Sequence, residues 1–236
     1  MKRFRRFPAV FLTCLLLWAC GGGGGSAPVS GGNDTTFANP TQVTVAGYSG
    51  DIMEPFVSRD GSVLFFNDNG SDKDIFYATW DVGTATWQFQ GCLDSIASPA
   101  VDGVPTMDDN RRFYYISTDN YPASLETIYV GDYDPTDPAI IVNVTSAGNL
   151  GEGIPGHLNF DVEVSADGRT LYYDDGIFSG QSFPDAADFV YARDDGSGFV
   201  RAADSAQVFA SINTADLEYA ACISRDEREF FFTRLT

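Results

Sequence analysis

The stretch that decides the fold is Glu54–Ala78, which reads EPFVSRDGSVLFFNDNGSDKDIFYA. A tight-turn signal at residues 57–61 precedes the apolar run Val63–Phe66, and a second polar turn at residues 68–72 leads into the apolar residues 75–77. Gly, Asp and Asn in the turns, with aromatic and β-branched residues between them, are typical of strand–turn–strand units. The stretch therefore predicts two neighbouring antiparallel strands.

The same unit returns three times along the chain. Each copy places an Asp in the turn before an apolar, aromatic run, and these residues, spaced by 49, 58 and 59 positions, are Asp60, Asp109, Asp167 and Asp226. We interpret them as structural, because Asp accepts hydrogen bonds in a tight turn. No segment after residue 36 has helical periodicity. A unit of roughly 50 residues with about four strands suits one blade of a β-propeller. The prediction is an all-β propeller of four-stranded antiparallel blades, with about four repeats visible and the last incomplete.

The repeat also resembles a known family. The pattern P-x-[apolar]-S-x-D-G-x-x-L-[FY]-[FY], followed by a polar turn and D-I-[FY], resembles the WD40-like (PD40) repeat of TolB-type propellers. Pro55–Phe66 matches it almost completely and Glu163–Tyr173 matches it well, whereas Asn110 and Glu227 replace the turn Gly in the second and fourth copies. The resemblance implies a TolB-like propeller domain over residues 41–236, with blades near 54–98, 104–150, 160–209 and, in part, 218–236. It is specific for the fold and not for a function.

Three complete units and part of a fourth leave the closure of the ring open. Thr41–Val45 alternates polar and apolar residues, and as a strand it would complete the last blade and close a four-bladed ring. The alternative is a truncated product of a five- or six-bladed protein. An open half-propeller would expose a long sheet edge.

The N-terminus predicts export. Residues 1–19 combine a basic start with a short apolar core at residues 10–18, the pattern of a secretory signal peptide. Leu17-Trp18-Ala19-Cys20 resembles the bacterial lipoprotein box, which implies that Cys20 is lipidated. Residues 20–40 would then be a lipidated Cys and a flexible Gly/Ser-rich tether. The resemblance implies a membrane-anchored lipoprotein at the periplasmic face or cell surface, and Gly21 in place of Asp favours the outer membrane.

The net charge limits the classes of partner, and the cysteine content bears on disulfide formation. The 236-residue chain has a net charge of −19, and removing the four basic residues of the signal segment leaves a charge near −23. Such an acidic surface repels nucleic acid, so we expect a protein or a glycan as the partner. Cys92 and Cys222 would remain in an oxidising compartment, either as a disulfide across blades or as two buried thiols.

The sequence shows no set of catalytic residues. It has no G-x-S-x-G motif, its single histidine, His157, is expected in a loop, and it has no zinc-binding cluster. The oxygen-rich loop Asp68–Asp74 invites a Ca²⁺ interpretation, but its spacing differs from that of an EF-hand, and a polar hairpin turn is the alternative. No cofactor is otherwise predicted.

Acidic residues that precede the turns are the remaining candidates for a site. Glu54, Asp161, Glu163 and Glu218 are expected on or near the innermost strands, where they would contact a ligand in the channel. The leading hypothesis is a non-catalytic binding or scaffold module. One alternative is a carbohydrate hydrolase or lyase that uses these carboxylates. Another is a fragment of a larger propeller.

Overall fold

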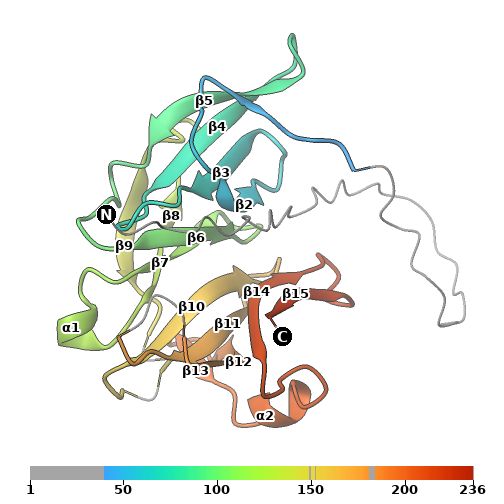
Figure 1. The fold of residues 1–236 in the computed structure, drawn as a ribbon. Coiled ribbons are helices and arrows are strands. Elements are labelled where there is room, and N and C mark those ends of the chain that lie inside the picture. Colours follow the sequence, from blue (N-terminus) through green and yellow to red (C-terminus); the bar gives the residue numbers. More distant parts are fainter. Residues whose placement is uncertain (1–39, 149, 152, 181–183, 236) are drawn as a thin grey trace, which may run out of the picture. The chain divides into compact units, whose positions relative to one another are not determined.

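The computed structural model describes residues 40–235 except 149, 152 and 181–183. The predicted signal segment, Cys20 and nearly all of the tether lie outside the described residues. Residues 40–44 belong to a separate unit of the chain and have no regular secondary structure. The unit from Val45 onward is almost entirely β, which confirms the predicted fold class (Figure 1).

The strands form successive antiparallel sheets that correspond to the repeats. Blade one contains β2 (Met53–Val57), β3 (Val63–Asn67), β4 (Ile75–Asp81) and β5 (Thr86–Cys92); blade two contains β6 (Asp102–Met107), β7 (Arg112–Ser117), β8 (Ile128–Tyr133) and β9 (Ile141–Ser146); blade three contains β10 (His157–Val164), β11 (Thr170–Ile177), β12 (Ala186–Asp194) and β13 (Phe199–Arg201); and blade four contains β14 (Leu217–Ile223) and β15 (Phe230–Leu235). The helices α1 (Tyr121–Ser124) and α2 (Ser205–Val208) are single turns. The first strands β2, β6, β10 and β14 lie next to one another in this order and form the inner edges of the blades.

The beginning of the unit joins blade one and not the last blade. β1 (Val45–Ala46) pairs in parallel with β5, and Tyr48 then packs its ring 5.0 Å from that of Phe66. This pairing contradicts the alternative in which Thr41–Val45 completes the last blade and closes a four-bladed ring. The physical reason is that Leu64 and Phe66 form an apolar face of blade one, and Val45 and Tyr48 pack against this face.

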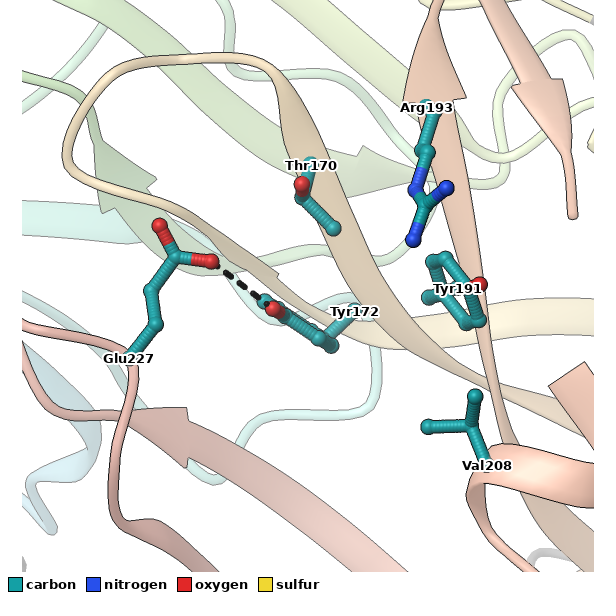
Figure 2. Close-up of a pocket in the computed structure, with 6 residues that line it drawn as sticks. All are labelled: Thr170, Tyr172, Tyr191, Arg193, Val208 and Glu227. Atoms are coloured by element: carbon teal, nitrogen blue, oxygen red, sulfur yellow. Dashed lines mark hydrogen bonds between the residues drawn. The ribbon is translucent and has the colours of Figure 1, made fainter.

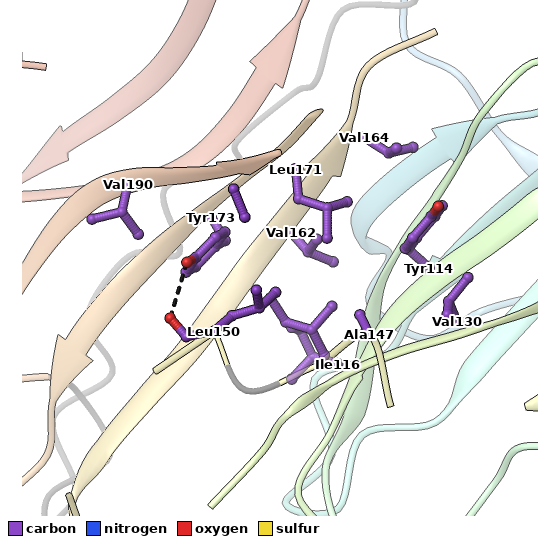
Figure 3. Close-up of a cluster of buried hydrophobic side chains, with 12 residues drawn as sticks. Tyr114, Ile116, Val130, Ala147, Leu150, Val162, Val164, Leu171, Tyr173 and Val190 are labelled. Carbon is purple, nitrogen blue, oxygen red and sulfur yellow. Dashed lines mark hydrogen bonds between the residues drawn. The ribbon is translucent and has the colours of Figure 1, made fainter. Parts of the chain in front are cut away.

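The core lies between consecutive blades. Alternate residues of a strand point to opposite faces, so the second strand of a blade contributes side chains to the interfaces on both sides of that blade. In β7, Phe113 and Tyr115 belong to the cluster shared with blade one, whereas Tyr114 and Ile116 belong to the cluster shared with blade three (Figure 3). Leu171 is fully buried in the latter cluster. These interfaces stack the blades and fix the positions of the inner strands.

The repeated turn has the predicted structural role in three of its four copies. In the first copy the Ser58 hydroxyl donates to Asp60 Oδ1 at 2.7 Å and accepts the Val63 N–H at 2.9 Å. The pairs Ser165–Asp167 and Ser224–Asp226 repeat this arrangement.

Blade two departs from the pattern. Asp108 Oδ1 accepts the N–H groups of Asn110 and Arg112, so Asp108 holds this turn. The turn is one residue shorter than the others, as the Asp108 N–H bonds to the Arg112 carbonyl across four positions instead of five. The prediction that Asp109 matches Asp60 is therefore wrong.

Candidate functional site: the inner strands and two clefts

Every inner strand contains a β-bulge at the same place. In each inner strand, the residue four positions before the first residue of the turn (Ser58, Asp108, Ser165 or Ser224) adopts positive φ, and the strand shifts its register against its neighbour there. These residues and their φ values are Glu54 (48°), Val104 (55°), Asp161 (50°) and Ala220 (60°). None is Gly, so each conformation costs about 1–2 kcal/mol. Bulges re-aim side chains, and here they turn two of the predicted acidic residues toward neighbouring blades.

Asp161 connects blade three to blade four. Its Oδ2 accepts the N–H of Ala220, the bulge residue of β14, at 2.9 Å, and only 7% of the residue is exposed. Burial, followed by the charge of Glu54, raises the pKa of Asp161 to about 7. The Asp161 side chain therefore links blade three to blade four through a hydrogen bond.

Glu54 lies on the same inner face but has a cationic partner. Its Oε1 is 3.4 Å from Lys73 Nζ, whereas Oε2 is buried without a hydrogen-bond partner. Lys73 comes from the oxygen-rich loop, whose Asp68 accepts the Asp74 N–H. Across the described residues, no cluster of three or more Asp, Glu, His or Cys side chains is placed to hold a metal ion.

Asp174 is the acidic residue that sequence reasoning missed. Asp174 follows two tyrosines in β11, and Asn67 follows two phenylalanines at the equivalent position of β3. Both residues are 0% exposed. Asn67 Oδ1 accepts the N–H of Val104, the bulge residue of the next blade, at 3.1 Å. Asp174 lies beside the corresponding N–H of Ala220, but neither of its oxygens completes a hydrogen bond. Burial, followed by the charge of Asp161, raises the pKa of Asp174 well above its ordinary value.

Glu163 and Glu218 are also buried and hydrogen-bonded to other residues of the propeller. Glu163 is 7% exposed and accepts the Thr106 hydroxyl of blade two at 2.7 Å, and burial raises its pKa to about 7. Glu218 is 0% exposed and accepts hydrogen bonds from Thr214 and, at 2.6 Å, from Arg234 Nε. Burial opposes the charged form of Glu218, but the hydrogen bonds from Thr214 and the charge of Arg234 outweigh it and lower the pKa.

The turn ends of blades one, two and four surround a recess of about 400 Å³. Asp109 accepts a hydrogen bond from Arg225 Nη2 at 2.5 Å and forms a looser ion pair with Arg59, whose Nε lies 3.7 Å away and donates to the Met107 carbonyl. Asp109, Arg59 and Arg225 occupy the same position of their respective turns, so they converge from different blades. Arg111 and Tyr133 also line the recess. This volume suits a side chain or a small polar group of a partner.

A second, smaller cleft of about 160 Å³ lies beside the junction of blades three and four (Figure 2). Its lining residues are Thr170, Tyr172, Tyr191, Arg193, Val208 and Glu227. The Tyr172 hydroxyl donates to Glu227 Oε2 at 3.1 Å, and the Arg193 guanidinium stacks over the Tyr191 ring at 5.1 Å.

The other predicted site residues do not converge on these clefts. Cys92 ends β5 in blade one and Cys222 lies in β14 of blade four, and the structure does not join them by a disulfide. His157 begins β10, so the expectation of a loop is wrong for this residue, and its carbonyl accepts the Tyr121 hydroxyl. We find no nucleophile–base pair around this half-buried histidine among the described hydrogen bonds.

Four-stranded antiparallel blades stacked through their faces define the fold of this protein as a β-propeller. No family model and no curated protein matches the chain. Similar solved structures include a putative TolB from Agrobacterium tumefaciens, with 15% identity, TM-score 0.48 and coverage of 77% of this chain and 53% of that one. TolB from Acinetobacter baumannii shows 16% identity, TM-score 0.41 and coverage of 65% and 32%.

A third similar structure is described as GH43B of a Bacteroides ovatus xyloglucan PUL, with 13% identity, TM-score 0.43 and coverage of 80% of this chain and 41% of that one. The chain spans about half the length of these proteins or less. At these identities the likeness concerns the fold alone, and any partner or activity has to be argued from the residues of this chain.

Proposed function

We propose that this protein is a non-catalytic binding module, exposed outside the cytoplasm, that engages a protein or glycan partner at the turn-end recess. The observation that carries the proposal is the state of the inner carboxylates. Asp161, Glu163 and Glu218 are at least nine-tenths buried, and each accepts hydrogen bonds from a neighbouring part of the frame. A glycosidase needs two carboxyl groups in contact with the substrate. These three groups are not available for that contact.

The recess, unlike the inner strands, contains exposed charged side chains. Arg111 and Arg225 are exposed there. The single negative charge of Asp109 is shared between two positive charges, those of Arg59 and Arg225, so these three residues keep a positive excess. Asp60 and Asp108 accept hydrogen bonds within their own turns. The groups free to meet a partner are therefore arginines, within a chain whose net charge is −19.

A photo-cross-linking residue placed at position 111 tests the proposal in cells. We expect a covalent adduct with a partner from position 111 and none from position 82, because Val82 is 84% exposed in the outer β4–β5 turn, away from the recess. Purified protein should release no reducing ends from a panel of polysaccharides. Turnover that Asp161→Asn or Glu163→Gln abolishes would overturn the binding-only proposal.

We also propose that Cys20 carries a lipid anchor and that the domain faces the periplasm or the cell exterior. The support is the lipobox-like sequence and the Gly-rich segment that follows it. The part of the chain that the structure describes contains no helix able to cross a membrane. Mass spectrometry of the mature N-terminal peptide should find acyl groups on Cys20, and Cys20→Ser should move the protein to the soluble fraction. An unmodified Cys20 in membrane-bound protein would contradict the anchor.

A further inference from the structure

The second residue of each repeated turn contacts a neighbouring turn. In blades one to four these residues are Arg59, Asp109, Ala166 and Arg225. Asp109 lies at the centre of the contacts, because its N–H donates to the Ala166 carbonyl and its carboxylate meets both Arg59 and Arg225. The turns therefore bring two guanidinium groups and one carboxylate together in the turn-end recess.

The charges of this set are unequal. Arg225 Nη2 donates to Asp109 Oδ2 at 2.5 Å, and Arg59 Nε lies 3.7 Å from Oδ1, so two cations share one anion. A guanidinium group carries five N–H donors. Over the described residues, the side-chain hydrogen bonds of Arg59 and Arg225 use one donor each. One positive charge and several donors are left for a second anion.

The Arg59 side chain is already oriented by the fold. Its Nε donates to the Met107 carbonyl at 3.1 Å, and its guanidinium carbon lies 5.5 Å from the centroid of the Phe56 ring. The side chain of Arg225 is 60% exposed, against 24% for that of Arg59, so Arg225 is the more adjustable of the two. A side chain fixed in advance loses less conformational entropy when it binds a ligand.

The other charged residues of the recess are Asp60, Asp108 and Arg111. Asp60 Oδ1 and Asp108 Oδ1 each accept hydrogen bonds from their own turns. Arg111 is exposed and takes no part in the ion pairs found among the described residues. These two carboxylates are thus engaged in the fold, whereas the arginines still offer donors.

We infer that the recess binds a carboxylate, supplied by an Asp or Glu side chain of a partner protein, between Arg59 and Arg225. A carboxylate there would complete a set of two cations and two anions with Asp109. Guanidinium and carboxylate groups match in shape, because two parallel N–H groups meet two oxygens. The single uncompensated charge suits a carboxylate better than a doubly charged phosphate. The inference rests on the proposed function and narrows its partner to a protein with an acidic side chain at the contact.

The overall charge favours a protein segment over an acidic glycan. The chain has a net charge of −19, and its field extends for a Debye length of about 8–10 Å at physiological salt. A polysaccharide that repeats an acidic sugar would be repelled along its length, whereas a peptide can carry one acidic residue among neutral ones. The one aromatic residue of the recess, Tyr133, is 7% exposed, so its ring offers little surface for a sugar to stack on.

The probe is an end-blocked peptide of sequence Gly-Ser-Gly-Glu-Gly-Ser-Gly, and its control has Gln in place of Glu. NMR titration of the isotope-labelled full-length chain in detergent, at about 50 mM salt, should shift the side-chain Nε–H signals of Arg59 and Arg225. We expect a Kd below about 5 mM for the Glu peptide and binding at least about fivefold weaker for the Gln peptide. The affinity should fall as salt is raised.

Three variants locate the site. Arg225→Gln should weaken binding of the Glu peptide at least about fivefold. The matched control is Arg228→Gln, because the Arg228 side chain is 84% exposed in the same turn but outside the recess, and binding should not change. Asp109→Asn removes the anion that competes for the two guanidinium groups, so binding should become about three- to tenfold tighter. A purely structural role of Asp109 predicts no such gain.

The remaining outcomes separate this inference from the proposed function. Equal shifts with the Glu and Gln peptides, or no gain in Asp109→Asn, would overturn the carboxylate site. Tighter binding of trigalacturonate than of the Glu peptide would make the partner an acidic glycan. No peptide binding, while position 111 still cross-links to a partner in cells, would overturn this inference alone. A partner peptide cross-linked at position 111 should contain Asp or Glu, and absence of any cross-link would overturn the proposed function and the partner named here with it.

Discussion

Replacing Asp174 with Asn should stabilise the fold, and the gain should grow with pH. The Asp174 carboxyl is 0% exposed, lacks a hydrogen bond on either oxygen, and has its pKa raised first by burial and then by the charge of Asp161. The folded state therefore holds a proton that the unfolded state loses above its ordinary pKa of 3.8. Stability falls as pH rises from 3.8 toward the raised pKa, by about 1.4 kcal/mol per pH unit.

The expected size of the effect follows from that slope. Asn does not titrate, and its amide could accept the Ala220 N–H and donate to the Asp161 carboxylate, which adds about 1 kcal/mol. The gain should be about 1 kcal/mol below pH 4, from the hydrogen bonds alone, and should grow by about 1.4 kcal/mol per pH unit until the pH reaches the raised pKa. At about 2–4 °C per kcal/mol for a domain of this size, each pH unit below the raised pKa should add about 3–6 °C to the gain in Tm.

Thermal unfolding followed by circular dichroism at pH 4.5, 6.0 and 7.5 measures this shift. The matched control is the reciprocal variant Asn67→Asp, which places a carboxyl at the equivalent position of blade one. There, Asn67 Oδ1 and Glu54 Oε2 both flank Gly103, at 3.2 and 3.6 Å from the place of a Cβ, so the new acid should lose stability as pH rises. A lower Tm for Asp174→Asn at pH 7.5, or the same shift at every pH, would refute the reasoning.

Three further outcomes are expected. The unfolding free energy of the unaltered protein should decline between about pH 4 and pH 7, since burial raises the pKa values of Asp161 and Glu163 to about 7; a urea midpoint that is flat over this range would contradict it. Ser165→Ala should cost about 1–2 kcal/mol in urea unfolding, because the hydroxyl accepts the Thr170 N–H at 2.9 Å, while Ser197→Ala in an exposed turn should cost little. Leu171→Ala should cost about 2–5 kcal/mol by the same measurement, because the side chain is fully buried between blades (Figure 3), and a loss below 1 kcal/mol would show that this interface is loosely packed.

The sequence was most informative where local chemistry repeats. The turn residues Ser58 and Asp60 and the run Val63–Phe66 act on neighbours within a few positions, so their spacing predicts a strand pair and its return predicts the blades. The one misalignment, Asp109, came from a turn shortened by one residue. The sequence could not reveal this shift, because Asp108 and Asp109 are adjacent and either one could supply the acidic side chain of the turn.

The site could not be predicted to the same depth because it depends on long-range placement. The bulges at Glu54 and Asp161 require positive φ without Gly, and no residue type marks that conformation. Asp174 acquires its raised pKa from Asp161 and from burial, and neither is visible in a linear pattern. The alternative that places Val45 in the last blade fails for a similar reason, because an alternating pattern predicts a strand but not its partner.

A raised pKa near 7 is what a general acid needs, and Asp161 and Glu163 have such values. The cause of the shift decides what it means. In both residues burial is the largest contribution, and both side chains accept hydrogen bonds from groups of neighbouring blades, Ala220 N–H and the Thr106 hydroxyl. An acid can protonate a substrate only if it touches it, and contact would break these inter-blade bonds. The same raised pKa values are therefore better understood as the cost of joining blades through buried carboxyl groups. The turn-end recess, where the side chains of Arg111 and Arg225 are exposed, is the surface that we propose for a partner.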